Sequence, residues 1–106
     1  MEQLPVDTPR GTAVPLAVLS IEPAEVTALL GLPFVEVAND LGPATLALIR
    51  LADGTLIAFA RLLQDVGPRV DVYHYDGYAR HPRPLPDALL RETGLAAELV
   101  TWVGED

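Results

Sequence analysis

The sequence predicts an α+β fold: a mainly antiparallel sheet of four to six strands with two short helices. Two apolar, β-like runs are joined by Asp53-Gly54, a dipeptide typical of tight hairpin turns. Two helix-like segments each end at a glycine, and short connections favour antiparallel pairing. The chain has 106 residues, and 50% of them are apolar. That is enough for one domain with a hydrophobic core, and too little for two.

The N-terminal part is expected to contribute little to this core. Prolines, a glycine and few apolar side chains predict a flexible leader over residues 1–12, followed by a single domain over 13–106. Val14–Ser20 is predicted to be a first, edge strand, because Pro15 has no N–H and a missing donor is tolerated near the start of an edge strand.

The next segment carries helix signals in the right order. Ser20 is a capping residue, Pro23 suits an early helical position, and Gly31 is a typical stop. One apolar stripe is expected on this helix, from Val26, Leu29 and Leu30. The following Leu32-Pro33 pair ends helical geometry and leads into a candidate strand over Phe34–Ala38.

A central hairpin is predicted over about residues 44–62, from Thr45–Leu51 and Thr55–Leu62. A two-residue turn at Asp53-Gly54 pairs Ile49 with Ala58. In that register one face carries mainly small and branched apolar residues, and the other carries Leu46, Leu48, Ile57 and Phe59. Two apolar faces require two covers, and a second copy of the chain is one candidate for the second face. A helix is the alternative for these runs, although Asp-Gly and the preceding Gly42-Pro43 would cut it short.

The C-terminal part adds two strands and a helix. Val70–Tyr75 alternates as a strand does, and Arg80–Pro86 holds three prolines and is expected to be extended. A second helix is predicted over Pro86–Thr93, with Gly94 as its stop, and a last strand over Leu99–Val103.

Charge excludes more functions than it identifies. Fifteen acidic residues against seven basic ones give a net charge of -8, spread evenly along the chain. This argues against nucleic acid or an anionic membrane as the main partner. The simplest role of such acidity is solubility, and the sharper one is electrostatic attraction to a basic partner.

Composition also suggests where the protein works. All seven basic residues are arginine, which is typical of a GC-rich bacterial genome, and neither a basic signal-like start nor a membrane-length apolar run is visible. We therefore expect a bacterial cytoplasmic protein. Because the chain has no cysteine and no glycine-rich phosphate loop, we expect no cofactor and no metal.

All the tyrosines and histidines fall between positions 73 and 81. Tyrosine and arginine provide much of the binding energy at protein interfaces, and a strand followed by a proline-rich loop presents them with little entropy loss. The predicted partner-binding residues are Tyr73, Tyr75, Asp76, Tyr78, Arg80 and Arg83. Aromatic packing within an edge strand is an equally good reading of the same cluster.

Catalysis or metal binding through His74, Asp76 and His81 is a weaker alternative. The alternation of the strand turns His74 toward the core, and the spacing matches no known metal signature. The residues together favour a small, acidic, non-enzymatic interaction module, of an inhibitor, antitoxin or immunity type, that binds a basic protein. A homodimeric structural domain, or a ligand-binding or enzymatic domain that uses residues 73–83, is the alternative.

Overall fold

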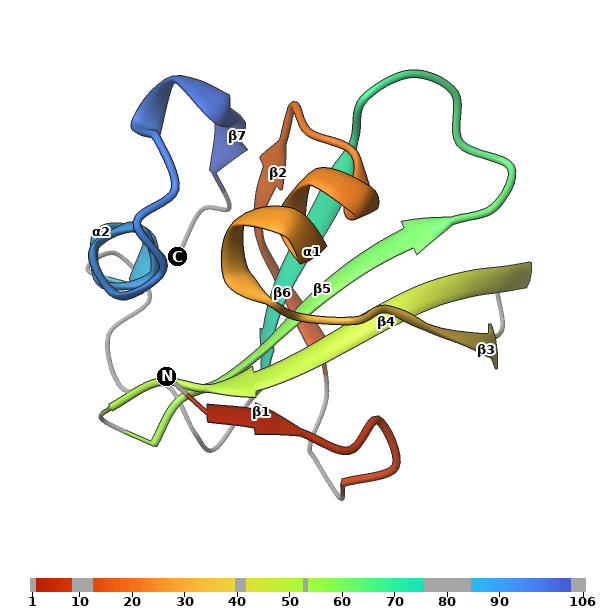
Figure 1. Cartoon of the computed structure of the whole chain (residues 1–106), viewed down its shortest axis with the longest axis horizontal. Helices are drawn as coiled ribbons and strands as arrows, with labels where there is room; N and C mark the ends of the chain where they lie inside the picture. Colours follow the sequence, from red (N-terminus) through yellow and green to blue (C-terminus); the bar gives the residue numbers. More distant parts are fainter. Residues whose placement is uncertain (1, 9–12, 40–41, 53, 76–84, 104–106) are drawn as a thin grey trace.

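The computed structural model is an open, antiparallel sheet with helices packed against it (Figure 1). It describes residues 2–8, 13–39, 42–52, 54–75 and 85–103. The elements follow in the order β1 (Glu2–Leu4), β2 (Ala13–Leu19), α1 (Pro23–Leu30), β3 (Val35–Asn39), β4 (Gly42–Arg50), β5 (Leu56–Leu62), β6 (Val70–Tyr75), α2 (Leu85–Thr93), a short 3₁₀ helix (Ala97–Leu99) and β7 (Val100–Val103).

The strands lie in the order β1-β4-β5-β6-β2-β7, and β3 also pairs with β4. β1 and β3 share the outer edge of β4, since β1 faces residues 48–50 and β3 faces residues 42–46. The α+β class is confirmed. The described residues form seven strands, rather than the predicted four to six, because Glu2–Leu4, which lies within the predicted leader, adds β1 to the edge of β4.

Part of the predicted leader pairs with the sheet. Glu2–Leu4 form β1, Leu4 is buried, and Arg50 of β4 forms an ion pair with Glu2 at 3.6 Å. The edge of β4 offers hydrogen-bonding groups that a short segment can use, and composition alone does not reveal this opportunity. Residues 9–12 of the predicted leader lie outside the described residues.

Val14–Ser20 was expected to be an edge strand, but β2 lies between β6 and β7. Pro15 is nevertheless accommodated, because β7 pairs only with Ala17, Val18 and Leu19 and does not reach it. The register with β6 also shifts between Pro15 and Ala17. Such an irregularity is a common place for a residue without an N–H.

Helix α1 begins later than its predicted cap. Glu22 is the N-cap and Pro23 the first helical residue, whereas the N–H of Ser20 donates to the carbonyl of Leu99 at 2.7 Å. Ser20 therefore links the segment that leads into α1 to the 3₁₀ helix that precedes β7, and it does not cap α1. The predicted stop is confirmed, since Gly31 has a φ of 69°.

The predicted apolar stripe of α1 is only partly correct. Val26 is fully buried and Leu30 packs against the core, but Leu29 is 65% exposed. A helix of eight residues presents only about two turns to the sheet, so few of its side chains can face the core.

The β4–β5 turn is one residue longer than predicted, and this changes the register. The N–H of Leu51 donates to the Thr55 carbonyl and the N–H of Gly54 to the Leu51 carbonyl, both at 2.9 Å. Gly54 has a φ of 91°, as expected for the last position of a three-residue hairpin loop. Ile49 consequently pairs with Ile57 and not with Ala58.

A one-residue shift moves every side chain of a strand to the opposite face. Leu46 and Leu48 therefore lie on one face of the sheet, whereas Ile57 and Phe59 lie on the other. All four side chains are buried within a single chain. The expected dimer surface made of these four residues is thus corrected: they do not share a face, and none offers exposed area to a second copy.

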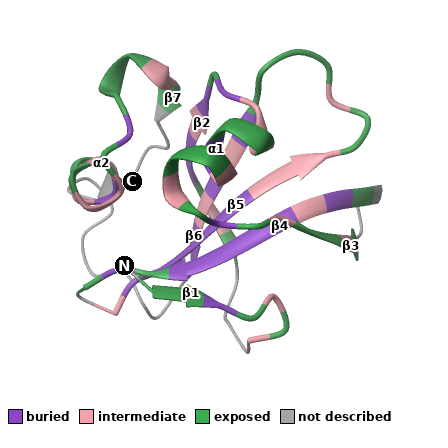
Figure 2. Ribbon diagram, in the orientation of Figure 1, coloured by how far each residue is buried: buried purple, intermediate pink, exposed green. Residues whose placement is uncertain are grey.

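Much of β4 and β5 is buried (Figure 2). Buried side chains form two clusters, one on each face of the sheet. The larger joins the sheet to both helices, through Val26 of α1, Leu89 of α2, and Phe59 and Val72 of the strands. The smaller is built around residues of β1, β4, β5 and β6: Leu4, Leu46, Leu48, Leu56, Ala58 and Tyr75. Residues of β4 and β5 therefore contribute buried side chains to both faces of the sheet.

The C-terminal elements agree closely with their predictions. β6 has the predicted bounds, α2 begins one residue earlier, and β7 one residue later. The N–H of Gly94, which has a φ of 73°, donates to the Leu90 carbonyl at 2.8 Å and ends α2 as expected. The predicted proline-rich connection before α2 lies largely outside the described residues.

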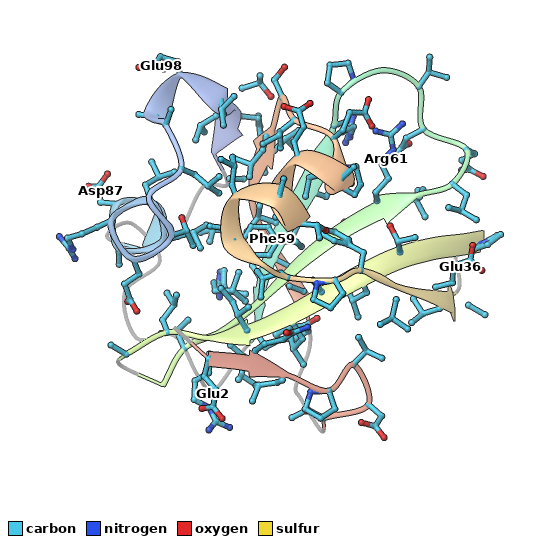
Figure 3. The ribbon with its side chains drawn as sticks, viewed as in Figure 1. Glu2, Glu36, Phe59, Arg61, Asp87 and Glu98 are labelled. Carbon is cyan, nitrogen blue, oxygen red and sulfur yellow. The ribbon has the colours of Figure 1, made fainter. Side chains whose placement is uncertain are left out.

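Replacing Phe59 by alanine should lower the free energy of unfolding by about 3–5 kcal/mol, because its fully buried ring would leave a cavity between the sheet and α1 (Figure 3). Leu29→Ala is the matched control, since its side chain is mostly exposed, and it should change stability by less than about 0.5 kcal/mol. Urea denaturation of the three proteins measures both values. Similar losses for the two variants would contradict the assigned core.

Candidate functional site

A concave feature lies on β6, β2 and β7, on the sheet face opposite the helix-packed cluster. It is an open groove of about 470 Å³, lined by Pro15, Ala17, Val18, Arg69, Asp71, Val72, Tyr73, Thr101 and Trp102. We call it the β6–β2–β7 groove. Strand alternation explains its position, because Val70 and Val72 are buried in the core while Asp71 and Tyr73 point to the other side.

Strand pairing brings the groove residues together from distant parts of the sequence. Asp71 of β6 is paired with Val18 of β2, which is itself paired with Trp102 of β7. Tyr73 lies two residues along β6 and opposite Pro15. The groove therefore has an apolar floor of Val18 and Pro15, with Tyr73 and Asp71 along one side and Trp102 on the other.

The groove contains one ion pair. Nε of Arg69 donates to Oδ1 of Asp71 at 3.0 Å. The Asp71 side chain is 15% exposed and the Arg69 side chain 50%. Asp71 is thus a largely enclosed carboxylate at the groove, and its cationic partner reaches it from solvent.

The position of Arg69 depends on Arg61, which lies near the end of β5 (Figure 3). Nη1 of Arg61 donates to Oε2 of Glu22 at 3.0 Å and to the carbonyl of Gly67 at 2.7 Å, and Nη2 donates to the carbonyl of Asp65 at 2.8 Å. A longer bond of 3.3 Å reaches the carbonyl of Arg69 itself. Arg61 therefore fixes the loop that delivers Arg69 to the groove.

Burial raises the pKa of Tyr73, and the nearby negative charge of Asp71 adds to the effect. The Tyr73 hydroxyl is consequently protonated at neutral pH and available as a hydrogen-bond donor and acceptor. Its ring is partly exposed, so the side chain combines apolar contact area with a polar tip at the groove.

The structure places two of the six predicted partner-binding residues. Tyr73 lines the groove, whereas Tyr75 is only 5% exposed and packs in the smaller cluster. Burial thus removes the Tyr75 ring from the predicted recognition surface, because it packs beside Leu4, Leu48 and Leu56. The remaining four, Asp76, Tyr78, Arg80 and Arg83, lie outside the described residues.

His74 is buried, on the core side of β6 where its alternation predicted it to be. His81 and Asp76, its proposed partners in catalysis or metal binding, lie outside the described residues. Within the described ranges, no three His, Cys, Asp or Glu side chains are grouped closely enough to hold a metal ion.

Sequence reasoning did not identify Trp102 as a site residue. Its side chain is 47% exposed, which is unusual for the only tryptophan of a small domain. The sequence placed it only in a last strand, and its neighbours Val18 and Asp71 are far away in the sequence. The available signal was its residue type, since tryptophan is among the side chains most enriched in binding hot spots.

Comparison with models of protein families, with curated protein sequences and with solved structures finds no match to this chain. In the part of the chain that is described, no helix has the length and apolar character needed to cross a bilayer. Function must therefore be argued from the groove itself.

The raised pKa of Tyr73 predicts a defined pH dependence. Because the folded state favours the neutral phenol, the stabilisation is complete below the ordinary pKa of 10.0 and is lost as pH rises through the higher folded-state value. Denaturation as a function of pH should show this loss in the wild type and less of it in Tyr73→Phe. Ultraviolet titration should show one tyrosine signal moving to lower pH in Asp71→Asn. An unchanged titration would contradict the contribution of Asp71.

Arg61→Met should lower the free energy of unfolding by about 1–3 kcal/mol, since several hydrogen bonds of a mostly buried guanidinium are lost. Hydrogen exchange should accelerate in residues 63–69, which its donors hold. Arg91→Met removes an exposed arginine of α2 and is the matched control, with little expected effect. Equal behaviour of the two variants would show that Arg61 does not organise the loop.

Proposed function

We propose that this protein is a small, acidic, non-enzymatic interaction module that binds a basic partner protein through the β6–β2–β7 groove. The role fits an inhibitor, antitoxin or immunity-type protein, working in a bacterial cytoplasm. One observation carries the proposal: a half-exposed Trp102 and a partly exposed Tyr73 flank one groove. Side chains of these types supply a large share of binding energy when a partner buries them.

The placement of these side chains on strands supports the proposal. Tyr73 belongs to β6, which is paired on both sides, and Trp102 belongs to β7, which is paired to β2. Paired strands hold side chains with less residual freedom than loops do, so a partner meets a surface that is already ordered. A surface built from loops would lose more conformational entropy on binding.

Electrostatics supports a basic partner. The net charge of the chain is -8, and three of its arginines are already paired with carboxylates: Arg50 with Glu2, Arg61 with Glu22 and Arg69 with Asp71. The acidic groups in excess leave a negative field around the molecule. Such a field accelerates encounter with a basic protein and disfavours an acidic one.

A small-ligand site is the second candidate, because the groove volume of about 470 Å³ lies in the range of ligand pockets. The openness of the groove to solvent favours a macromolecular partner, since small ligands are usually enclosed on most sides. A homodimer is the further alternative, and it would need a surface other than the buried hairpin residues.

The test is purification of tagged protein from its host, identification of the bound proteins, and reconstitution with the purified partner. Trp102→Ala and Tyr73→Ala should each weaken that reconstituted complex by at least about tenfold, as expected for hot-spot residues. Each variant must first be shown to be folded by circular dichroism and urea denaturation.

Leu63→Ala and Val66→Ala are the matched controls, because both remove exposed apolar side chains from the β5–β6 loop outside the groove. They should leave affinity unchanged. The proposal is wrong if both groove variants bind the partner as the wild type does, or if the groove variants only abolish self-association measured by sedimentation.

A further inference from the structure

We infer that the β6–β2–β7 groove receives an arginine side chain of the partner, with its guanidinium against Trp102 and Tyr73 and paired with Asp71. The inference rests on the proposed function and specifies the chemistry that the groove recognises. The proposed occupant is a cationic side chain of a protein, rather than an anion or an apolar side chain.

The arrangement of the groove fits this occupant. Asp71 and Trp102 are separated by one intervening strand residue, Val18, so their Cα atoms are about 10 Å apart at the usual spacing of strands. An aliphatic stem can lie on the apolar floor of Val18 and Pro15 between them. Its charged end then meets an aromatic side chain and a carboxylate together.

Arginine suits these groups better than lysine does. A guanidinium is planar, so it stacks on an aromatic ring, and its several donors can engage a carboxylate and a hydroxyl at once. The Tyr73 hydroxyl is neutral at neutral pH, as that of tyrosine ordinarily is, and its oxygen can accept a hydrogen bond from such a group.

The protein already shows that this carboxylate binds a guanidinium. Arg69 contacts Asp71 through a single pair of atoms, Nε and Oδ1, at 3.0 Å, and half of the Arg69 side chain is exposed. An ion pair that is made by one hydrogen bond and whose cation is half exposed to solvent contributes little stability. Arg69 is therefore an internal competitor that a better-placed arginine, supported by two aromatic rings, can displace.

The competition makes a discriminating prediction. If the groove binds a cation, Arg69→Ala should tighten binding severalfold, because it frees Asp71. If the groove instead binds an anion, Arg69 would be the attracting group and the same variant should weaken binding.

The probe is N-acetyl-arginine amide, with binding followed by the fluorescence of Trp102, the only tryptophan in the chain. We expect a saturable change with the arginine amide, a weaker response with the lysine amide and none with the citrulline amide, which has the same shape without the charge. Equal responses to arginine and citrulline amides would overturn the inference.

Charge-matched variants separate a specific contact from the overall field. Asp71→Asn should weaken binding of the arginine amide by about tenfold, as loss of a charge-assisted pair does, whereas Asp87→Asn on α2 changes the net charge equally and should have almost no effect. Arg91→Ala is the corresponding control for Arg69→Ala. Equal effects within either pair would show that only net charge acts.

The outcomes distinguish this inference from the proposed function. If the reconstituted complex requires Trp102 and Tyr73 but is unaffected by Asp71→Asn, and the arginine amide does not bind, the interaction module stands and the arginine site is wrong. If the arginine amide binds as expected but the complex ignores all groove variants, the proposed function is wrong and the groove is a cation site of another role.

Discussion

The guanidinium of Arg61 is the interaction on which the arrangement of this small domain most depends. It donates to the side chain of Glu22, the residue that caps α1, and to backbone carbonyls of the loop between β5 and β6. One side chain thereby ties the start of the first helix to the end of β5 and to the approach of β6. The chain has no disulfide to perform this role, because it contains no cysteine.

The contacts of Arg61 affect the groove through the position of β6. The loop that Arg61 holds ends at Arg69, and Val70 follows as the first, fully buried residue of β6. From there, alternation places Val72 in the core and Asp71 and Tyr73 at the groove. The groove side of the strand is therefore set by how its other side packs against the helices, and the loop fixes where that alternation begins.

Local signals in the sequence were sufficient to predict most elements, whereas the pairing of distant segments could not be predicted from them. Glycine stops, proline starts and period-two alternation correctly located β6, both helix ends and the Asp-Gly turn, because each depends on neighbouring residues. The predicted register of the β4–β5 hairpin was wrong because two- and three-residue loops share the Asp-Gly signature. Hydrophobic patterning normally resolves such a choice, but Leu46, Leu48, Ile57 and Phe59 are apolar whichever face they occupy.

The same difference between local and long-range signals applies to the residues of the candidate site. Tyr73 was singled out because tyrosines cluster in the sequence, whereas Trp102 joins it only through the pairing of β2 with both β6 and β7. No local pattern encodes that pairing. The burial of Tyr75 has another long-range cause: it lies on the same side of β6 as Tyr73, but β1 and β4 add Leu4 and Leu48 to the cluster that buries it.

The burial of Tyr75 beside an accessible Tyr73 also shows how the sheet limits the groove. On one face, the β1, β4 and β5 side of the sheet is closed by its own apolar cluster, while the β6, β2 and β7 side of that face is hollowed. The groove side of that face presents one tryptophan, one tyrosine and one enclosed carboxylate. Because the strands that carry these groups are also held by the core, the proposed cationic partner would find them already in position, and little ordering would oppose its binding.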